Sequence, residues 1–163
     1  MSIPRSIRFL FASALLVGLP ALAATKTATF QVKAEITNDC TIAAADLNFG
    51  QIGLVSANVD AQSTLTATCT NTTTYNLGLN AGTATGSTIE NRLLANAATT
   101  LGFQLYRNPT RTQIWGTTVG TDTMSGTGNG SAQNVNVYGR IPPQTPAPAP
   151  GVYTTTITVT VTY

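Results

Sequence analysis

Hydrophobic and polar residues alternate one by one along much of this chain of 163 residues. A period of two is typical of half-buried β-strands, because successive side chains of a strand point to opposite faces of the sheet. Such alternation, or a short apolar run, marks the segments 30–37, 47–50, 64–70, 75–79, 101–105, 114–115, 135–137 and 153–163. The last run contains no turn residue, so it predicts one long terminal strand. The chain is therefore expected to be all-β.

The number and spacing of these strands favour a particular architecture. About seven or eight strands with frequent turn signals are typical of an antiparallel β-sandwich of immunoglobulin-like size. A β-barrel is the alternative, because periodicity does not distinguish the two. Residues 89–98 fit either a short helical turn or an irregular connection. Loops are predicted within this one domain at Gly116–Gly130, rich in glycine, threonine and serine, and at Pro142–Gly151, which carries five prolines.

Composition narrows the chemistry. Threonine occurs 31 times, whereas charged residues make up only 9% of the chain, and there is no histidine. Ser-His-Asp triads, Cys-His dyads and histidine-ligated metal sites are therefore excluded within this chain. The six acidic residues are scattered, so we expect no enzyme activity, no cofactor and no bound metal. A small lectin or hydrolase stays open as a minor alternative. A lectin would need grouped aromatic rings, and a hydrolase would need carboxylates that meet in space.

The first residues have the features of a secretory signal peptide. Two arginines precede an apolar run at 9–19, which is too short to span a bilayer, and small residues follow it. We predict a signal peptide at 1–23, cut between Ala23 and Ala24, with an uncleaved anchor as the alternative. Cleavage would leave a mature domain of residues 24–163 with six basic and six acidic residues. This neutral chain offers no basic patch for nucleic acid.

Secretion determines how the two cysteines are interpreted. Cys40 and Cys69 both lie in the predicted mature chain. In an oxidising compartment two cysteines most simply pair, so we predict a Cys40–Cys69 disulfide. The bridge would close a loop of about 30 residues, worth roughly 3 kcal/mol in the chain-entropy account. Free thiols or a metal pair are weaker alternatives, since two cysteines without histidine cannot complete a zinc site.

Six short motifs, in order, resemble the spore coat protein U domain family, which includes pilins of archaic (Csu-type) chaperone–usher pili. Together they cover essentially all of residues 24–163. The motifs are Ile36-Thr37-Asn38-Asp39-Cys40; Leu47-Asn48-Phe49-Gly50; Leu65-Thr66-Ala67-Thr68-Cys69; Leu105-Tyr106-Arg107-Asn108 with Arg111-Thr112 and Trp115-Gly116; Tyr138-Gly139-Arg140-Ile141-Pro142; and Gly151-Val152-Tyr153 before a terminal strand. One departure is Asn108, where the family often has aspartate; both residues suit the same turn.

The resemblance implies a structural role and a set of partners. Such pilins are immunoglobulin-like sandwiches that lack one strand. A periplasmic chaperone fills the gap first, and the N-terminal strand of the next subunit then replaces it at an outer-membrane usher. The resemblance therefore implies a secreted subunit of a surface fibre that supports adhesion or biofilm formation. Its partners would be other pilin subunits, the chaperone and the usher, and it would pass through the periplasm to the cell surface.

The resemblance also assigns roles to the two ends of the mature chain. The candidate donor strand is Ala24–Ala34, and Ile36 is expected to belong to the first strand of the sandwich itself. The inward-facing plugs of the donor would be Ala28, Phe30, Val32 and Ala34. The candidate acceptor edge is the terminal strand, lined by Ile157, Val159 and Val161. The alternative is a secreted coat or matrix protein whose own N-terminal strand completes its sandwich and which does not polymerise.

Overall fold

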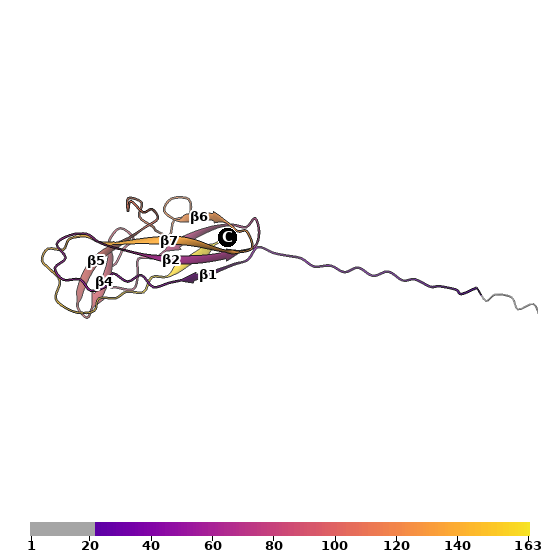
Figure 1. The fold of residues 1–163 in the computed structure, drawn as a ribbon, viewed down its shortest axis with the longest axis horizontal. Helices are drawn as coiled ribbons and strands as arrows, with labels where there is room; N and C mark the ends of the chain where they lie inside the picture. Colours follow the sequence, from indigo (N-terminus) through magenta and orange to yellow (C-terminus); the bar gives the residue numbers. More distant parts are fainter. Residues whose placement is uncertain (1–21) are drawn as a thin grey trace, which may run out of the picture. The chain divides into compact units, whose positions relative to one another are not determined.

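The computed structural model describes residues 22–163. The predicted signal peptide lies outside the described residues except for Leu22 and Ala23. Within the described range, no helix combines the length and apolar character needed to cross a membrane. The chain divides into two units, Met1–Ala34 and Glu35–Tyr163. The described residues of the first unit form no strand, and the second unit contains two β-sheets (Figure 1).

The second unit is an antiparallel β-sandwich. Five strands form one sheet in the order β1-β2-β7-β5-β4, and three form the other in the order β6-β3-β8. Two separate sheets confirm the predicted sandwich, and the barrel alternative is wrong. In chain order, the strands are β1 (Cys40–Ala44), β2 (Val59–Cys69), β3 (Thr74–Leu79), β4 (Arg92–Asn96), β5 (Thr99–Tyr106), β6 (Met124–Thr127), β7 (Ala132–Ile141) and β8 (Val159–Thr162).

The core lies between the sheets and is built from alternate residues of the strands. The strands predicted from alternation at 64–70, 75–79, 101–105 and 135–137 are confirmed as β2, β3, β5 and β7. Trp115 is fully buried at the centre, and its indole N–H donates to the carbonyl of Leu77 at 2.7 Å. The core side chains are Val55, Leu65, Ala67, Cys69, Tyr75, Leu77, Leu79, Leu101, Phe103, Leu105, Trp115, Val137 and Ile141.

The terminal strand is shorter than its alternation predicts. Residues 155–158 are not in a strand, and only Val159–Thr162 form β8. Here side chains of the loop that follows β3 take the place of a strand partner. The amide of Thr158 donates to Asn80 Oδ1 at 2.9 Å, and the amide of Thr156 donates to Thr83 Oγ1 at 3.2 Å. Alternation alone cannot reveal this substitution, since the backbone stays extended and the apolar residues still face the core.

Three other marked segments form no strand. They are 30–37, 47–50 and 114–115, and in the last of these Ile114 makes only an isolated bridge with Tyr106. At 47–50 the apolar side chains cover β7 instead. A Cβ built on Gly139 would lie 2.9 Å from the ring of Phe49 and 3.0 Å from Leu47, so this glycine leaves the space that both side chains occupy. Phe49 also meets Phe103 edge to face, with ring centroids 6.3 Å apart. The motif therefore acts through side-chain packing rather than through a sheet.

Two strands lie in segments expected to be irregular. Residues 89–98 contain β4, and the predicted loop Gly116–Gly130 contains β6. Both strands are short and lack a clean apolar alternation. β6 depends on a close approach, because a Cβ on Gly126 would overlap the ring of Tyr75 on the paired strand. Composition indicated a loop, whereas the glycine is needed for strand pairing beneath an aromatic ring.

Candidate functional site

The candidate site is the free side of β8, at the edge of the smaller sheet. Val159 and Val161 are half-buried and pack against the core, and Ile157 continues this row just before the strand. The intervening threonines are exposed. Within the described residues β8 pairs with β3 alone. The predicted acceptor residues therefore share one inward-facing row along an edge that has a strand on one side only.

The backbone of β8 shows which groups face the free side. The amide of Asn80 donates to the carbonyl of Thr158 at 3.1 Å, so the even-numbered residues of this segment bond to β3. In an antiparallel pair, alternate residues turn their N–H and C=O groups to opposite sides. The backbone groups of Ile157, Val159 and Val161 consequently point away from β3. The same residues point apolar side chains toward the core and, toward the free side, backbone groups that have no strand partner within residues 22–163.

β1 forms a second free edge next to β8. It is the outer strand of the larger sheet and pairs with β2 alone within the described residues. The odd-numbered residues bond to β2, as shown by Asp39, whose carbonyl accepts from the amide of Thr70 at 2.9 Å. Cys40, Ile42 and Ala44 therefore direct their backbone groups outward. Because β1 and β8 lie in contact, we call their two free sides together the open edge.

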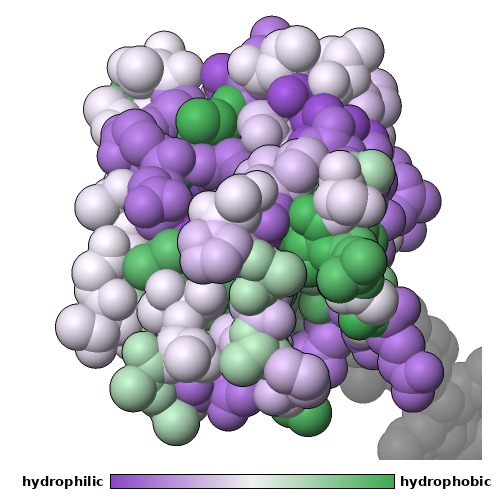
Figure 2. All heavy atoms as spheres, turned by 90° about the vertical axis from the view of Figure 1, so that its left-hand side faces the viewer, coloured by the Kyte–Doolittle hydropathy of each residue, from purple (hydrophilic) through white to green (hydrophobic). Residues whose placement is uncertain are grey.

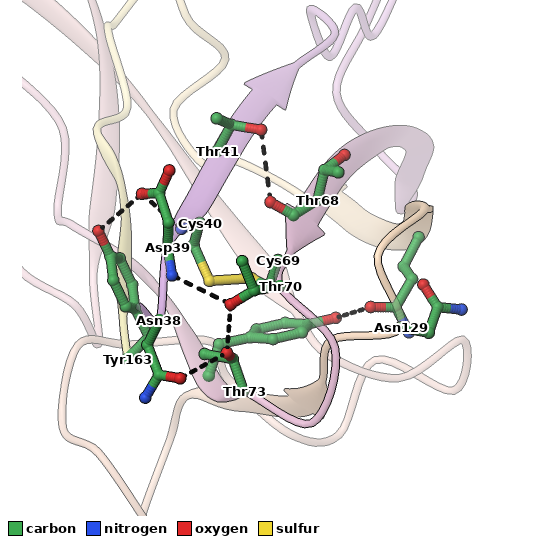
Figure 3. The surroundings of a disulfide bond; sticks show 12 residues. Asn38, Asp39, Cys40, Thr41, Thr68, Cys69, Thr70, Thr73, Asn129 and Tyr163 are labelled. Carbon is green, nitrogen blue, oxygen red and sulfur yellow. Dashed lines mark hydrogen bonds between the residues drawn. A yellow bond between two sulfur atoms is a disulfide. The ribbon is translucent and has the colours of Figure 1, made fainter. Parts of the chain in front are cut away.

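A hydrogen-bonded cluster fixes one end of the open edge (Figure 3). Cys40 and Cys69 form the disulfide that the sequence predicts, and they are direct partners in the β1–β2 register. Asp39, next to the disulfide, donates its amide to Thr70 Oγ1 at 3.1 Å. Its Oδ1 accepts the amide of Cys40 at 2.9 Å and the hydroxyl of Tyr163 at 3.3 Å. The disulfide and this aspartate thus hold the start of β1 beside the end of β8.

The predicted donor segment contains no strand and its apolar side chains face solvent. Phe30 is 88% exposed and Val32 is 87% exposed. Ile36 does not belong to the first strand of the sandwich, contrary to expectation, because it is 89% exposed and β1 begins only at Cys40. Large apolar side chains are unfavourable in water unless a partner covers them. The roles of the four predicted plugs stay predictions.

Sequence reasoning missed Arg92, which closes the opposite part of the sandwich. Its side chain is fully buried and donates to the carbonyls of Leu79 and Trp115 at 2.9 and 2.6 Å. It also bonds to the carbonyls of Asn80 and Ile89 and to the side chain of Gln104. Burial lowers the pKa of Arg92 to about 10, so it stays charged at neutral pH. An arginine in a mostly apolar window gives no sequence signal for such a buried contact.

Several charged and aromatic side chains outside the open edge make structural contacts. Asp60 accepts two hydrogen bonds from Arg140 at 2.7 and 2.9 Å, and Arg111 lies 3.3 Å from the same carboxylate. Tyr75 and Trp115 fill the core rather than forming a sugar-stacking platform. In residues 22–163 no three histidine, cysteine or acidic side chains gather as metal ligands. Figure 2 shows that the face at the β4 and β5 end is largely polar, with apolar side chains in separate small patches.

Comparison with known proteins gives a match to a family model, a similar protein of known name and similar solved structures. The Spore Coat Protein U domain matches residues 26–160. Protein U of Myxococcus xanthus is 36% identical over 147 residues, which cover 80% of this chain and 82% of Protein U. Among solved structures, a similar chain occurs in the CsuC–CsuE chaperone–tip adhesion subunit pre-assembly complex from the archaic chaperone–usher Csu pili of Acinetobacter baumannii. That match has a TM-score of 0.58 and 24% identity, so it shows a shared fold. It covers 78% of this chain but only 40% of the other.

Proposed function

The chain belongs to the Spore Coat Protein U domain family, and from this premise we propose that it is a secreted structural subunit of a surface fibre. The fibre grows by donor-strand exchange, in which the segment Ala24–Ala34 of one subunit fills the open edge of another, and it supports adhesion or biofilm formation. The observation that carries the proposal is the open edge itself. It combines outward-facing backbone groups of β1 and β8 with a half-buried apolar row on β8.

An added strand would satisfy both needs of the open edge at once. Unpaired backbone groups on a long edge favour pairing with another chain, and strand addition supplies those hydrogen bonds. Phe30 and Val32, exposed in their own chain, would be buried against the apolar row of Ile157, Val159 and Val161. Burying a large apolar side chain contributes roughly 1.5–3 kcal/mol. The plugs and the acceptor row are both apolar, so both sides remove apolar surface from water on contact.

Ile36 extends this donor segment. It continues the alternation of the predicted plugs and is as exposed as Phe30. We therefore assign it to the donor rather than to the sandwich, which leaves only residues 37–39 between donor and β1. A short connection suits a fibre, because it holds successive subunits close together. The donor and acceptor surfaces differ, so the contact is head-to-tail and generates an open chain rather than a closed ring.

Partners and location follow from the same mechanism. A subunit with an open edge would aggregate if left uncovered, so a periplasmic chaperone is needed to hold the edge until an outer-membrane usher exchanges it. The similar solved chain comes from a chaperone–subunit complex, which supports this assignment. The predicted signal peptide would deliver the chain to the periplasm, and the fibre would end at the cell surface. We assign no enzyme activity, cofactor or nucleic acid to this function.

The test is the assembly of the mature chain. We expect unheated detergent gels to show a ladder of oligomers that collapses to monomer on boiling, because a dissociating subunit must expose a whole edge at once. Deleting Ala24–Ala34 should abolish the ladder. A synthetic peptide of that segment should bind the truncated chain and raise its melting temperature. A truncated chain that is a stable monomer and gains nothing from the peptide would rule out the missing-strand mechanism.

The second candidate is a coat or matrix protein with a self-completed sandwich. The name of the family and the similarity to Protein U favour keeping it. In this case the donor segment would fold back beside β1 through residues 37–39 of its own chain. The two candidates differ in concentration dependence, since a self-completed chain stays monomeric at any concentration. A dilution series followed by light scattering therefore separates them.

A further inference from the structure

We propose that Lys26 of one subunit forms an ion pair with Asp39 of the next, and that this pair fixes the orientation and register of the donor strand on β8. This inference rests on the proposed donor-strand exchange and specifies how the strand lies in the open edge. It assigns a role to two charged residues that the assembly mechanism does not otherwise use. The partner is a second copy of this chain.

The first observation is the phase of Lys26 in the donor segment. Lys26 is even-numbered, as are the plugs Ala28, Phe30, Val32 and Ala34, so on an extended strand all five side chains point to the same face. Lys26 therefore lies immediately before the first plug and, on the docked donor, faces the acceptor. Burying an ammonium group without a partner is strongly unfavourable, so this lysine must reach either solvent or a carboxylate. Lys33, by contrast, lies on the opposite face.

The second observation is a carboxylate at the end of the acceptor row. Asp39 is joined to the end of β8 through the hydroxyl of Tyr163, and the amides of Cys40 and Asp39 fix its position (Figure 3). All its side-chain hydrogen bonds within the described residues use Oδ1, which leaves Oδ2 available.

These two positions coincide in one antiparallel register. Directly opposite residues in a sheet share a face, so inward plugs pair with the inward residues of the acceptor row. Placing Ala28 opposite Val161 and Phe30 opposite Val159 brings Val32 opposite Ile157. Two residues beyond Ala28, Lys26 then lies opposite Tyr163, whose hydroxyl already contacts Asp39. The plug row and the ion pair are therefore satisfied together.

The alternatives lack this match. A parallel donor would place Lys26 at the other end of the row, where the amides of Thr156 and Thr158 meet the neutral side chains of Thr83 and Asn80. A shift of the antiparallel donor by two residues in one direction would move Lys26 beyond Tyr163 and out to solvent. The same shift in the other direction would bury the ammonium beside Val161. Charge complementarity thus selects one arrangement among those that the apolar alternation permits.

The experiment compares full-length mature chains by the half-life of their dimer band in detergent at fixed temperature. Lys26→Gln and Asp39→Asn each remove one charge, and the carboxamide oxygen introduced by Asp39→Asn can still accept the amide of Cys40. We expect each to shorten the half-life roughly fivefold, as for a partly exposed ion pair. The double variant should be no worse than either single variant, because one interaction is lost only once. Lys33→Gln and Asp46→Asn are the matched controls and should leave the half-life unchanged.

The outcomes separate this inference from the proposed function. A normal oligomer ladder whose half-life is insensitive to Lys26→Gln overturns the ion pair and leaves donor-strand exchange standing. Equal effects of Lys26→Gln and Lys33→Gln would show a general charge effect and also overturn it. Absence of any ladder in the unmodified chain removes both proposals. Asp39→Asn could also shorten the half-life by changing the sandwich itself. Lys26 lies before the sandwich, so Lys26→Gln tests the ion pair without that second effect.

Discussion

Two parts of the terminal segment face very different surroundings. At Thr154 the backbone exchanges two hydrogen bonds with Ala95 of β4, at 2.9 and 3.0 Å, and the buried Arg92 nearby has carbonyl acceptors on several sides. A few residues later, Val159 and Val161 pair on one side only, and their other backbone groups have no strand partner within residues 22–163. The chain thus supplies partners to the backbone of Thr154 but, within the described residues, offers no strand to the outward-facing backbone groups of Val159 and Val161.

The difference separates a part of the sandwich that is held by its own contacts from an edge that has a strand on one side only within the described residues. Arg92 and Trp115 tie β3, β4 and β5 together with contacts from a single chain. The disulfide holds β1 against β2 even though β1 has no second neighbour within the described residues. These contacts within the chain stabilise the sandwich and do not involve the free sides of the open edge. Substitutions in the two regions should therefore have different consequences, one for folding and the other for assembly.

The largest effect is expected at the closed region, from Arg92→Met. Methionine would fill much of the space but would leave the carbonyls of Leu79 and Trp115 buried without a donor. Each unsatisfied buried group costs about 1–3 kcal/mol, so the loss of donors to two carbonyls should lower the free energy of unfolding by about 2–6 kcal/mol. Urea unfolding of the donor-complemented chain measures this loss. Arg140→Met is the control. Arg140 is only partly buried and its ion-pair partner Asp60 reaches solvent, so this change should alter stability by less than about 1 kcal/mol. Similar losses in both variants would contradict the comparison.

The next effect is expected at the open edge, from Phe30→Asp or Val32→Asp. A carboxylate carried into an apolar contact would remain unpaired, at a cost of several kcal/mol, so the oligomer ladder should disappear. The chaperone-held subunit should stay folded, because neither residue is part of the sandwich. Lys33→Ala, on the opposite face, should leave assembly unchanged. Detergent gels and circular dichroism distinguish the two outcomes. Equal defects from inward and outward positions would refute the assigned face.

Loss of the disulfide should have an intermediate effect. It should lower the stability of the sandwich and leave the donor segment itself unchanged. Free-thiol labelling of the unreduced, denatured mature chain should find no reactive cysteine. Replacing both Cys40 and Cys69 by alanine should lower the free energy of unfolding by roughly 3 kcal/mol, the loop-closure value for this spacing. Assembly should weaken as well, because β1 would no longer be held beside β8. Unchanged melting of the double variant would show that the β1–β2 pairing needs no covalent support.

The smallest effect concerns acid pH at the surface. The hydrogen bonds from Arg140, helped by the charge of Arg111, hold the pKa of Asp60 below its usual value. A carboxylate with a lowered folded-state pKa stabilises the fold above its unfolded pKa of about 3.9, and this contribution is lost as the pH falls further. Asp60→Asn should therefore reduce stability slightly at pH 7 and flatten the loss of stability as the pH falls below about 4. Melting curves at several pH values test this, with Asp46→Asn as the control.

Sequence alone determined the class of the fold and its covalent bond. Alternation is a local property, and the central strands β2, β3, β5 and β7 follow it because one face of each is buried in the core. The disulfide followed from the presence of two cysteines in a chain with a predicted secretory leader. The family resemblance followed from short motifs, one of which, at 47–50, proved to work through contacts with Gly139 rather than as a strand.

Tertiary structure alone decided the edges. β4 and β6 exist because neighbouring strands and a close-packed ring stabilise segments whose own patterns are weak. The terminal run divides into two parts because Asn80 and Thr83, distant in sequence, supply side-chain acceptors to one of them. The roles of Arg92 and Asp39 likewise depend on groups that are distant in sequence. Arg92 donates to the carbonyl of Trp115, and Asp39 accepts from the hydroxyl of Tyr163. Periodicity states which face of a strand is buried, whereas only the folded sandwich decides which side of a strand has a neighbour.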